Sequence, residues 1–146
     1  MQCYEITKSD IRELADVFRI VFNAEPWNDN WTIQTAFNRI SIQLSNKNCI
    51  GWKAIEKNKI LGFVIGYITG LPNGKGFFVE DLCVLPDEQK RGIGKDLIET
   101  MEKSIMKIDI KTVITTTAKG LSAYEFYIKN GFIDNHTTVG LYKRLG

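Results

Sequence analysis

The feature that most constrains the fold of this chain is the stretch LPDEQKRGIGK, residues 85–95, which separates two kinds of hydrophobic pattern. The apolar run before it, residues 77–85, is typical of a buried strand, whereas residues 92–108 carry apolar side chains at helical spacing. The β-branched run at residues 112–118 then indicates another strand. This succession predicts a mixed α/β (α+β) domain in which a helix connects two strands.

The remaining elements are predicted from periodicity and turn residues. Helices are expected over residues 10–24, 32–44 and 122–129, and further strands at residues 4–6, 52–56, 60–69, 132–133 and 138–143. The predicted order is βααβββαβαββ. Neither a repeat nor a linker interrupts it, so a single domain is expected over residues 1–146.

Composition argues against several classes of protein. The net charge is +2, with 44% hydrophobic and 25% charged residues, and no basic arm for nucleic acid stands out. No apolar stretch reaches the length of a membrane span or signal peptide, and the three cysteines have no metal-type spacing. His136 is the single histidine. We therefore expect a cytoplasmic protein with no metal, membrane or nucleic-acid partner.

The junction at residues 85–95 has two readings. Gly92 and Gly94 allow a ligand to approach the backbone, and a helix that begins there directs free amide groups at the same place. Lys90, Arg91 and Lys95 add positive charge, so a diphosphate is a suitable ligand. The alternative is an ordinary turn and helix start. The P-loop and dinucleotide patterns both fail here, because required glycine and hydroxyl positions are occupied by other residues.

Gln89-Lys90-Arg91-Gly92-Ile93-Gly94 resembles the Gln/Arg-x-x-Gly-x-Gly/Ala motif of the GNAT superfamily of acetyl-CoA-dependent N-acetyltransferases. The strand at residues 80–86 and the late helix at residues 123–132, with its Gly-Phe ending, resemble the same family in the same order. The resemblance implies a mixed, mostly antiparallel sheet of six to seven strands with about four helices. It also implies acetyl-CoA as the acetyl donor and a homodimeric assembly.

The resemblance assigns the cofactor contacts to two segments. Main-chain groups of Leu82, Cys83 and Val84 would pair with the pantetheine arm as an added strand. The diphosphate would be held by the amides of Gln89, Lys90, Arg91, Gly92, Ile93, Gly94 and Lys95. Gly120 stands where many family members have Asn, and Ser122 is the hydroxyl that could replace that contact.

Two side chains are candidates for the chemistry. A carboxylate in an apolar strand is costly unless paired or used, so Glu80 is predicted to be the base or to bind the substrate amine. Asp81 is predicted to be a structural or substrate-side contact, on the opposite face of the strand unless a bulge shifts the alternation. By resemblance, Tyr127 would protonate the leaving thiolate, and the alternative is a packed aromatic ring.

The acceptor is expected in an aromatic pocket beside the loop between the first two helices. Trp27 and Trp31 lie in this loop, and Phe22 and Tyr67 are further candidates, although both tryptophans could simply fix the loop to the core. A small-molecule amine is predicted, whether amino acid, peptide N-terminus, polyamine or aminoglycoside-like. The rival functions are a non-catalytic coenzyme A sensor and a nucleotide-phosphate protein.

Overall fold

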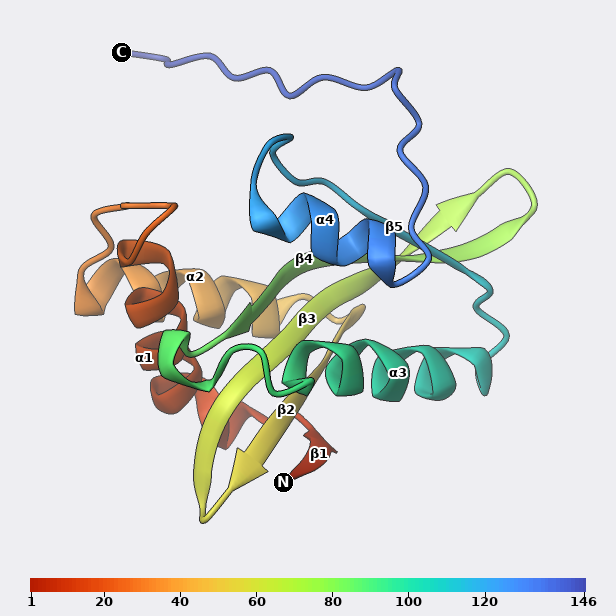
Figure 1. Cartoon of the computed structure of the whole chain (residues 1–146). Helices are drawn as coiled ribbons and strands as arrows, with labels where there is room; N and C mark the ends of the chain where they lie inside the picture. Colours follow the sequence, from red (N-terminus) through yellow and green to blue (C-terminus); the bar gives the residue numbers. More distant parts are fainter. The chain divides into compact units, whose positions relative to one another are not determined.

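The computed structural model describes residues 1–146, which form two compact units, Met1–Thr116 and Thr117–Gly146. The first unit is built on a five-stranded sheet with the order β1-β2-β3-β4-β5 (Figure 1). The strands are β1 (Gln2–Glu5), β2 (Cys49–Glu56), β3 (Lys59–Leu71), β4 (Gly74–Val84) and β5 (Thr112–Thr115). The first four are antiparallel neighbours, and β5 runs parallel to β4.

Helices cover both faces of this sheet (Figure 1). On one face lie α1 (Ile11–Asn23) and α2 (Ile33–Ser45), whose apolar sides bury Phe18 and Ile40 against Phe63 and Ile65 of β3. On the other face lies α3 (Ile93–Met106). Its buried stripe is Ile93, Leu97, Ile98, Met101 and Ile105. The helical spacing of apolar residues predicted this stripe as far as Ile105, but Ile108, expected to continue it, lies beyond the helix and is 46% exposed.

A β-bulge interrupts the pairing of β3 with β4. Ile65 lies opposite Asp81 and Gly66 opposite Val79, so Glu80 is the extra residue on β4. Such a residue shifts the alternation of side chains along a strand. The expectation that Glu80 and Asp81 face opposite sides is therefore wrong, because both side chains lie on the face covered by α2.

Strands β4 and β5 run side by side over only part of their length. Their pairing extends from Gly76 opposite Thr112 to Val79 opposite Thr115, where the Thr115 hydroxyl donates to the Val79 carbonyl at 3.0 Å. Strand β4 continues to Val84, still paired with β3 on its other side. The end of β4 that follows Glu80 thus has one edge without a neighbouring strand.

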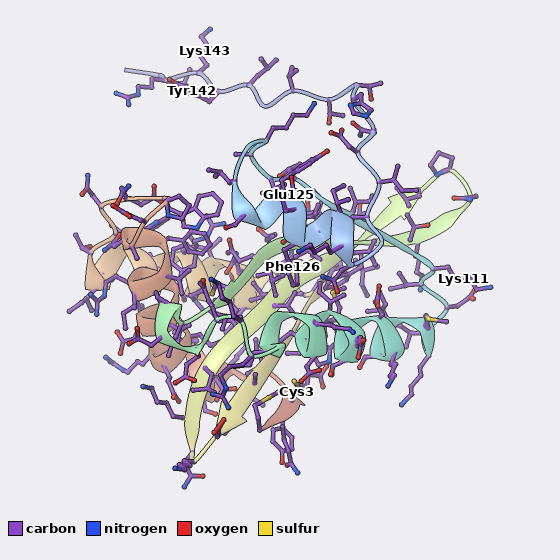
Figure 2. All side chains as sticks on the ribbon, in the orientation of Figure 1. Cys3, Lys111, Glu125, Phe126, Tyr142 and Lys143 are labelled. Atoms are coloured by element: carbon purple, nitrogen blue, oxygen red, sulfur yellow. The ribbon has the colours of Figure 1, made fainter.

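The second unit contains α4 (Ser122–Lys129) and an extended C-terminal segment, on which Figure 2 shows Tyr142 and Lys143. The sheet has five strands, and the sixth and seventh, expected at residues 132–133 and 138–143, are not seen. The Phe132 amide instead donates to the Tyr127 carbonyl at the end of α4. The amides of His136 and Thr137 donate to the side chains of Asp134 and Asn135, which favours turns over a strand.

None of the helices is long and apolar enough to cross a membrane.

Candidate active site

A hollow of about 330 Å³ opens between α2 and the bulged part of β4. Glu80 lines it from the strand and Trp31 from the loop before α2. The helix contributes Thr35, Asn38, Arg39, Ile42 and Gln43. The bulge has a direct consequence here, because it brings the Glu80 carboxyl to the same face as the α2 side chains. A carboxylate, an aromatic ring and several hydrogen-bonding groups therefore meet in one concave site.

Asp81 lies beneath this hollow and is only 7% exposed. Arg39 holds it with two hydrogen bonds, from Nε to Oδ2 at 3.0 Å and from Nη2 to Oδ1 at 3.1 Å. The Gln43 amide nitrogen donates to the same Oδ2 at 2.7 Å. Both oxygens of Asp81 are thus used by α2, and of the two roles expected for Asp81 this geometry favours the structural one.

Glu80 is half-buried, and its surroundings change its acidity. Burial raises the pKa of the Glu80 carboxyl, and the neighbouring Asp81 carboxylate raises it further, against the opposing effects of Arg39 and Gln43. A carboxylate with a raised pKa is a stronger base than an exposed one. The environment of Glu80 therefore suits either of the roles expected from the sequence, proton acceptor or binding group for an ammonium.

The loop between α1 and α2 is held by its aromatic residues. Trp31 packs edge-on against Phe18 with ring centroids 4.8 Å apart, and Trp27 packs against Phe22 at 5.4 Å. Asn23 fixes the Trp31 backbone, since its side chain bonds both the Trp31 amide at 2.8 Å and the Trp31 carbonyl at 2.9 Å. Both tryptophans thus pin the loop, and Trp31 also lines the hollow.

The other two aromatic candidates lie outside the lining of the hollow. Phe22 packs against Phe18, with ring centroids 4.6 Å apart, as well as against Trp27. Tyr67 of β3 stacks on Phe78 of β4 with centroids 5.4 Å apart. Their contact with an acceptor stays a prediction.

The free edge of β4 carries main-chain groups that do not pair with β3. The Leu85 amide donates to the Leu61 carbonyl of β3 at 2.8 Å, and alternate residues of an antiparallel strand face the same neighbour. Cys83 therefore also faces β3, and its carbonyl leaves no room for a side chain on Gly62, where a Cβ would lie 2.6 Å away. The main-chain groups of Leu82 and Val84 face the free edge, where the Gln89 side chain donates to the Val84 carbonyl at 3.1 Å.

The turn that follows β4 leads into helix α3, whose first residues have no side-chain cap. Pro86–Glu88 form a short 3-10 helix, and α3 begins after Gly92, which has a φ of 81° and makes no side-chain cap. The first amide bonded within the helix is that of Asp96, which donates to the Gly92 carbonyl at 3.0 Å. The amides of Ile93, Gly94 and Lys95 precede it. They are available to an anion at the positive end of the helix dipole.

The cations of this turn divide into two kinds. Arg91 is bound on both sides, by Glu88 and by the Glu56 carboxylate, 2.7 Å from Nη2, so its guanidinium fastens the turn to the end of β2. Lys90, with a φ of 66°, makes no ion pair, and Lys95 lies 4.0 Å from Glu99. Because the pair of Lys95 with Glu99 is long and exposed, both lysines can contribute positive charge to a bound anion.

Helix α4, in the second unit, carries Tyr127, the residue predicted to protonate the leaving thiolate. Tyr127 is 8% exposed and packs edge-on against Phe126 and Phe132, with ring centroids 5.6 and 5.0 Å away. Ser122 is the exposed first residue of the helix. Gly120 has a φ of 82°, a conformation that glycine and asparagine adopt more readily than other residues.

Sequence reasoning missed the contribution of α2 to the site. Arg39 and Gln43 were not singled out, and neither were the lining residues Thr35 and Asn38. A signal was present, because Gln43 follows Ala36 and Ile40 at helical spacing and so occupies a position on the buried stripe. A polar residue at such a position indicates a buried partner, which is Asp81.

One known family model matches more than half of the chain. The model of the GNAT acetyltransferase domain matches residues 47–134, which contain the bulged strand, the turn and helix α4. The chain therefore belongs to the GNAT acetyltransferases, which are acetyl-CoA-dependent acyltransferases. A search of curated protein sequences finds no significant match.

Solved structures share the fold at low sequence identity. An aminoglycoside acetyltransferase from an uncultured soil metagenomic sample, solved with trehalose, has a TM-score of 0.79 at 20% identity, covering 99% of this chain and 96% of its own. A ribosomal-protein-alanine N-acetyltransferase from Brucella melitensis has a TM-score of 0.80 at 15% identity, covering 98% and 100%. A predicted acetyltransferase from Clostridium acetobutylicum, solved with acetyl-CoA, has a TM-score of 0.71 at 18% identity, covering 97% and 95%.

Proposed function

We propose that the protein transfers an acetyl group from acetyl-CoA to a primary amine of a small molecule, by direct attack of the amine in a ternary complex. The observation that carries this proposal is the meeting of Glu80 with the α2 side chains in one hollow, at the point where β4 loses its neighbouring strand. An acceptor in the hollow would lie next to a donor bound along the free edge.

The free groups of the first unit suit coenzyme A. The amides of Ile93, Gly94 and Lys95 would hold the diphosphate, with Lys90 and Lys95 supplying positive charge. The Leu82 main chain and the Val84 amide would pair with the pantetheine amides as an added strand. Gln89 and Arg91 would act indirectly, because Gln89 bonds the Val84 carbonyl and Arg91 fastens the turn.

Glu80 and Tyr127 are the side chains that we assign to proton transfer. The neutral amine nitrogen forms a bond to the thioester carbonyl carbon, and the carbon–sulfur bond then breaks. Glu80 takes the proton that the nitrogen loses, directly or through water, which its raised pKa favours. Tyr127 gives a proton to the leaving thiolate, since a phenol and a thiol have comparable acidity.

Assays of thiol release with acetyl-CoA and a panel of amines test this proposal. We expect release that depends on the amine and a product that carries one acetyl group. Binding of acetyl-CoA without amine-dependent release from any member of the panel would favour the coenzyme A sensor. Binding of ATP or NAD that coenzyme A does not displace would favour a nucleotide-phosphate protein. A single domain, a homodimer and a cytoplasmic location stay predictions that rest on sequence and family resemblance.

A further inference from the structure

The hollow contains one cation, and that cation is already paired. Arg39 is the only basic residue in its lining, and an arginine in an acceptor pocket would ordinarily suit a substrate carboxylate. Here its Nε and Nη2 both donate to Asp81. Its guanidinium also lies over the rings of Phe18 and Trp31, at 5.2 and 5.7 Å from their centroids, which fixes the side chain in place.

The net charge of the ionisable side chains at the hollow is negative. Arg39 and Asp81 cancel each other, so the ionised Glu80 carboxylate contributes one negative charge that no cation in the lining balances. Asp29 adds a second carboxylate at the loop, where its Oδ2 accepts a hydrogen bond from the Trp31 indole at 3.1 Å. An ammonium is attracted to such a site, whereas a carboxylate is repelled.

Gln43 adds a fixed hydrogen-bond acceptor to this charge pattern. Its amide is only 5% exposed, and the bond from Nε2 to Asp81 sets the direction of the amide. The opposite atom, Oε1, is buried and has no donor. A buried acceptor without a donor is costly, so an N–H or O–H donor that reached Gln43 would be favoured over an acceptor group.

We propose that the hollow selects amines that have no carboxylate beside the amino group, so that free α-amino acids are poor acceptors. This inference rests on the proposed function and narrows its acceptor class to amino sugars, polyamines, peptide N-termini and similar compounds. The pairing of Arg39 with Asp81 carries it, because the same arginine without its partner would favour the opposite class.

Matched pairs of amines that differ by one carboxylate provide the test. Putrescine and ornithine, tyramine and tyrosine, and histamine and histidine would be compared by kcat/KM for thiol release. They would also be compared by calorimetric affinity for the protein saturated with coenzyme A. In each pair of which at least one member is acetylated, we expect kcat/KM and affinity to be higher by about tenfold or more for the compound without the carboxylate. Equal values, or preference for the amino acids, would overturn the inference.

The variant Asp81→Asn gives a second test, because it removes the charge that neutralises Arg39 and keeps the shape of the side chain. The ratio of kcat/KM for the amine without the carboxylate to kcat/KM for the matching amino acid should fall by about tenfold in this variant. Asp109→Asn is the matched control, since Asp109 is exposed in the turn that follows α3, and the preference of this variant should equal that of the wild type. An unchanged preference in folded Asp81→Asn would overturn the inference. If that variant fails to fold, the wild-type comparison decides alone.

The two readouts separate this inference from the proposed function. If no amine caused thiol release but the compounds without a carboxylate still bound more strongly, the proposed transfer would be contradicted. The proposed selectivity of the hollow would be supported. Transfer to amino acids in preference to their decarboxylated counterparts would establish the transferase and contradict the selectivity. Absence of both binding and release for all members of the pairs would contradict the inference.

Discussion

Arg39 of α2 holds the buried Asp81 carboxylate of β4 through two nearly equal hydrogen bonds, at 3.0 and 3.1 Å. This pair connects the helix that lines the hollow to the strand that carries Glu80. Removing the arginine would leave a buried carboxylate with Gln43 as its remaining partner. The pair therefore positions the site and contributes to the stability of the fold.

Arg39→Ala should lower the free energy of unfolding by about 2 kcal/mol, below the usual cost of breaking a buried pair because the Arg39 side chain is 35% exposed. Chemical denaturation at neutral pH measures this. Arg12→Ala is the matched control, because Arg12 stacks over Phe37 at 5.5 Å and makes no ion pair; we expect a loss of about 0.5 kcal/mol. Equal losses of unfolding free energy in the two variants would show that the ion pair of Arg39 with Asp81 adds no stability.

Glu80→Gln tests the proposed base. We expect kcat/KM to fall by about a hundredfold or more while the affinity for acetyl-CoA is unchanged. In the wild type the rate should fall as the pH drops through the raised pKa of Glu80, because only the ionised carboxylate accepts a proton. That acid limb should be missing from the variant. A variant with the same acid limb as the wild type would assign the limb to another group.

Gly92→Asp tests the diphosphate site at the start of α3. A carboxylate there would repel the diphosphate, and we expect coenzyme A to bind at least about a hundredfold more weakly. Gly92→Asn is the matched control, because asparagine also tolerates the φ of 81° and carries no charge. Calorimetric titration with coenzyme A distinguishes the two variants. If Gly92→Asp bound coenzyme A with wild-type affinity, the start of α3 would not be the diphosphate site.

Tyr127→Phe tests the proposed acid. The substitution keeps the ring that packs against Phe126 and Phe132 and removes only the hydroxyl. We expect kcat to fall by about a hundredfold, with little change in acetyl-CoA affinity. Tyr124→Phe on the same helix is the control, because the Tyr124 hydroxyl donates to Asp134 and is not assigned to the chemistry. Similar turnover in both variants would make Tyr127 a packing residue.

The sequence predicted the fold best where one pattern covers a whole element. The order of the elements through α4 agrees with the structure, because each has its own periodicity and turn residues. The prediction failed at residues 138–143, where β-branched and aromatic residues resemble a strand. Leu141 and Tyr142 are about nine-tenths exposed, at 92% and 90%, and belong to no strand. Strand propensity alone does not supply a partner.

The site was predictable only in part, because its geometry depends on contacts that are distant in the sequence. Glu80 and Asp81 could be singled out as carboxylates inside an apolar strand. The bulge that places them on one face depends on the pairing of β3 with β4. Arg39 lies 42 positions from Asp81 in the chain, so their pairing could not be predicted from one sequence.

Acetyl transfer at this hollow is tested most directly by a single-turnover reaction of purified protein, acetyl-CoA and the amine panel, followed by mass spectrometry. We predict one N-acetylated product for each thiol released, formed with wild-type protein and at least about a hundredfold more slowly with Glu80→Gln. Thiol release without an acetylated amine, or equal rates for the two proteins, would contradict the assignment of this hollow as the site of acetyl transfer.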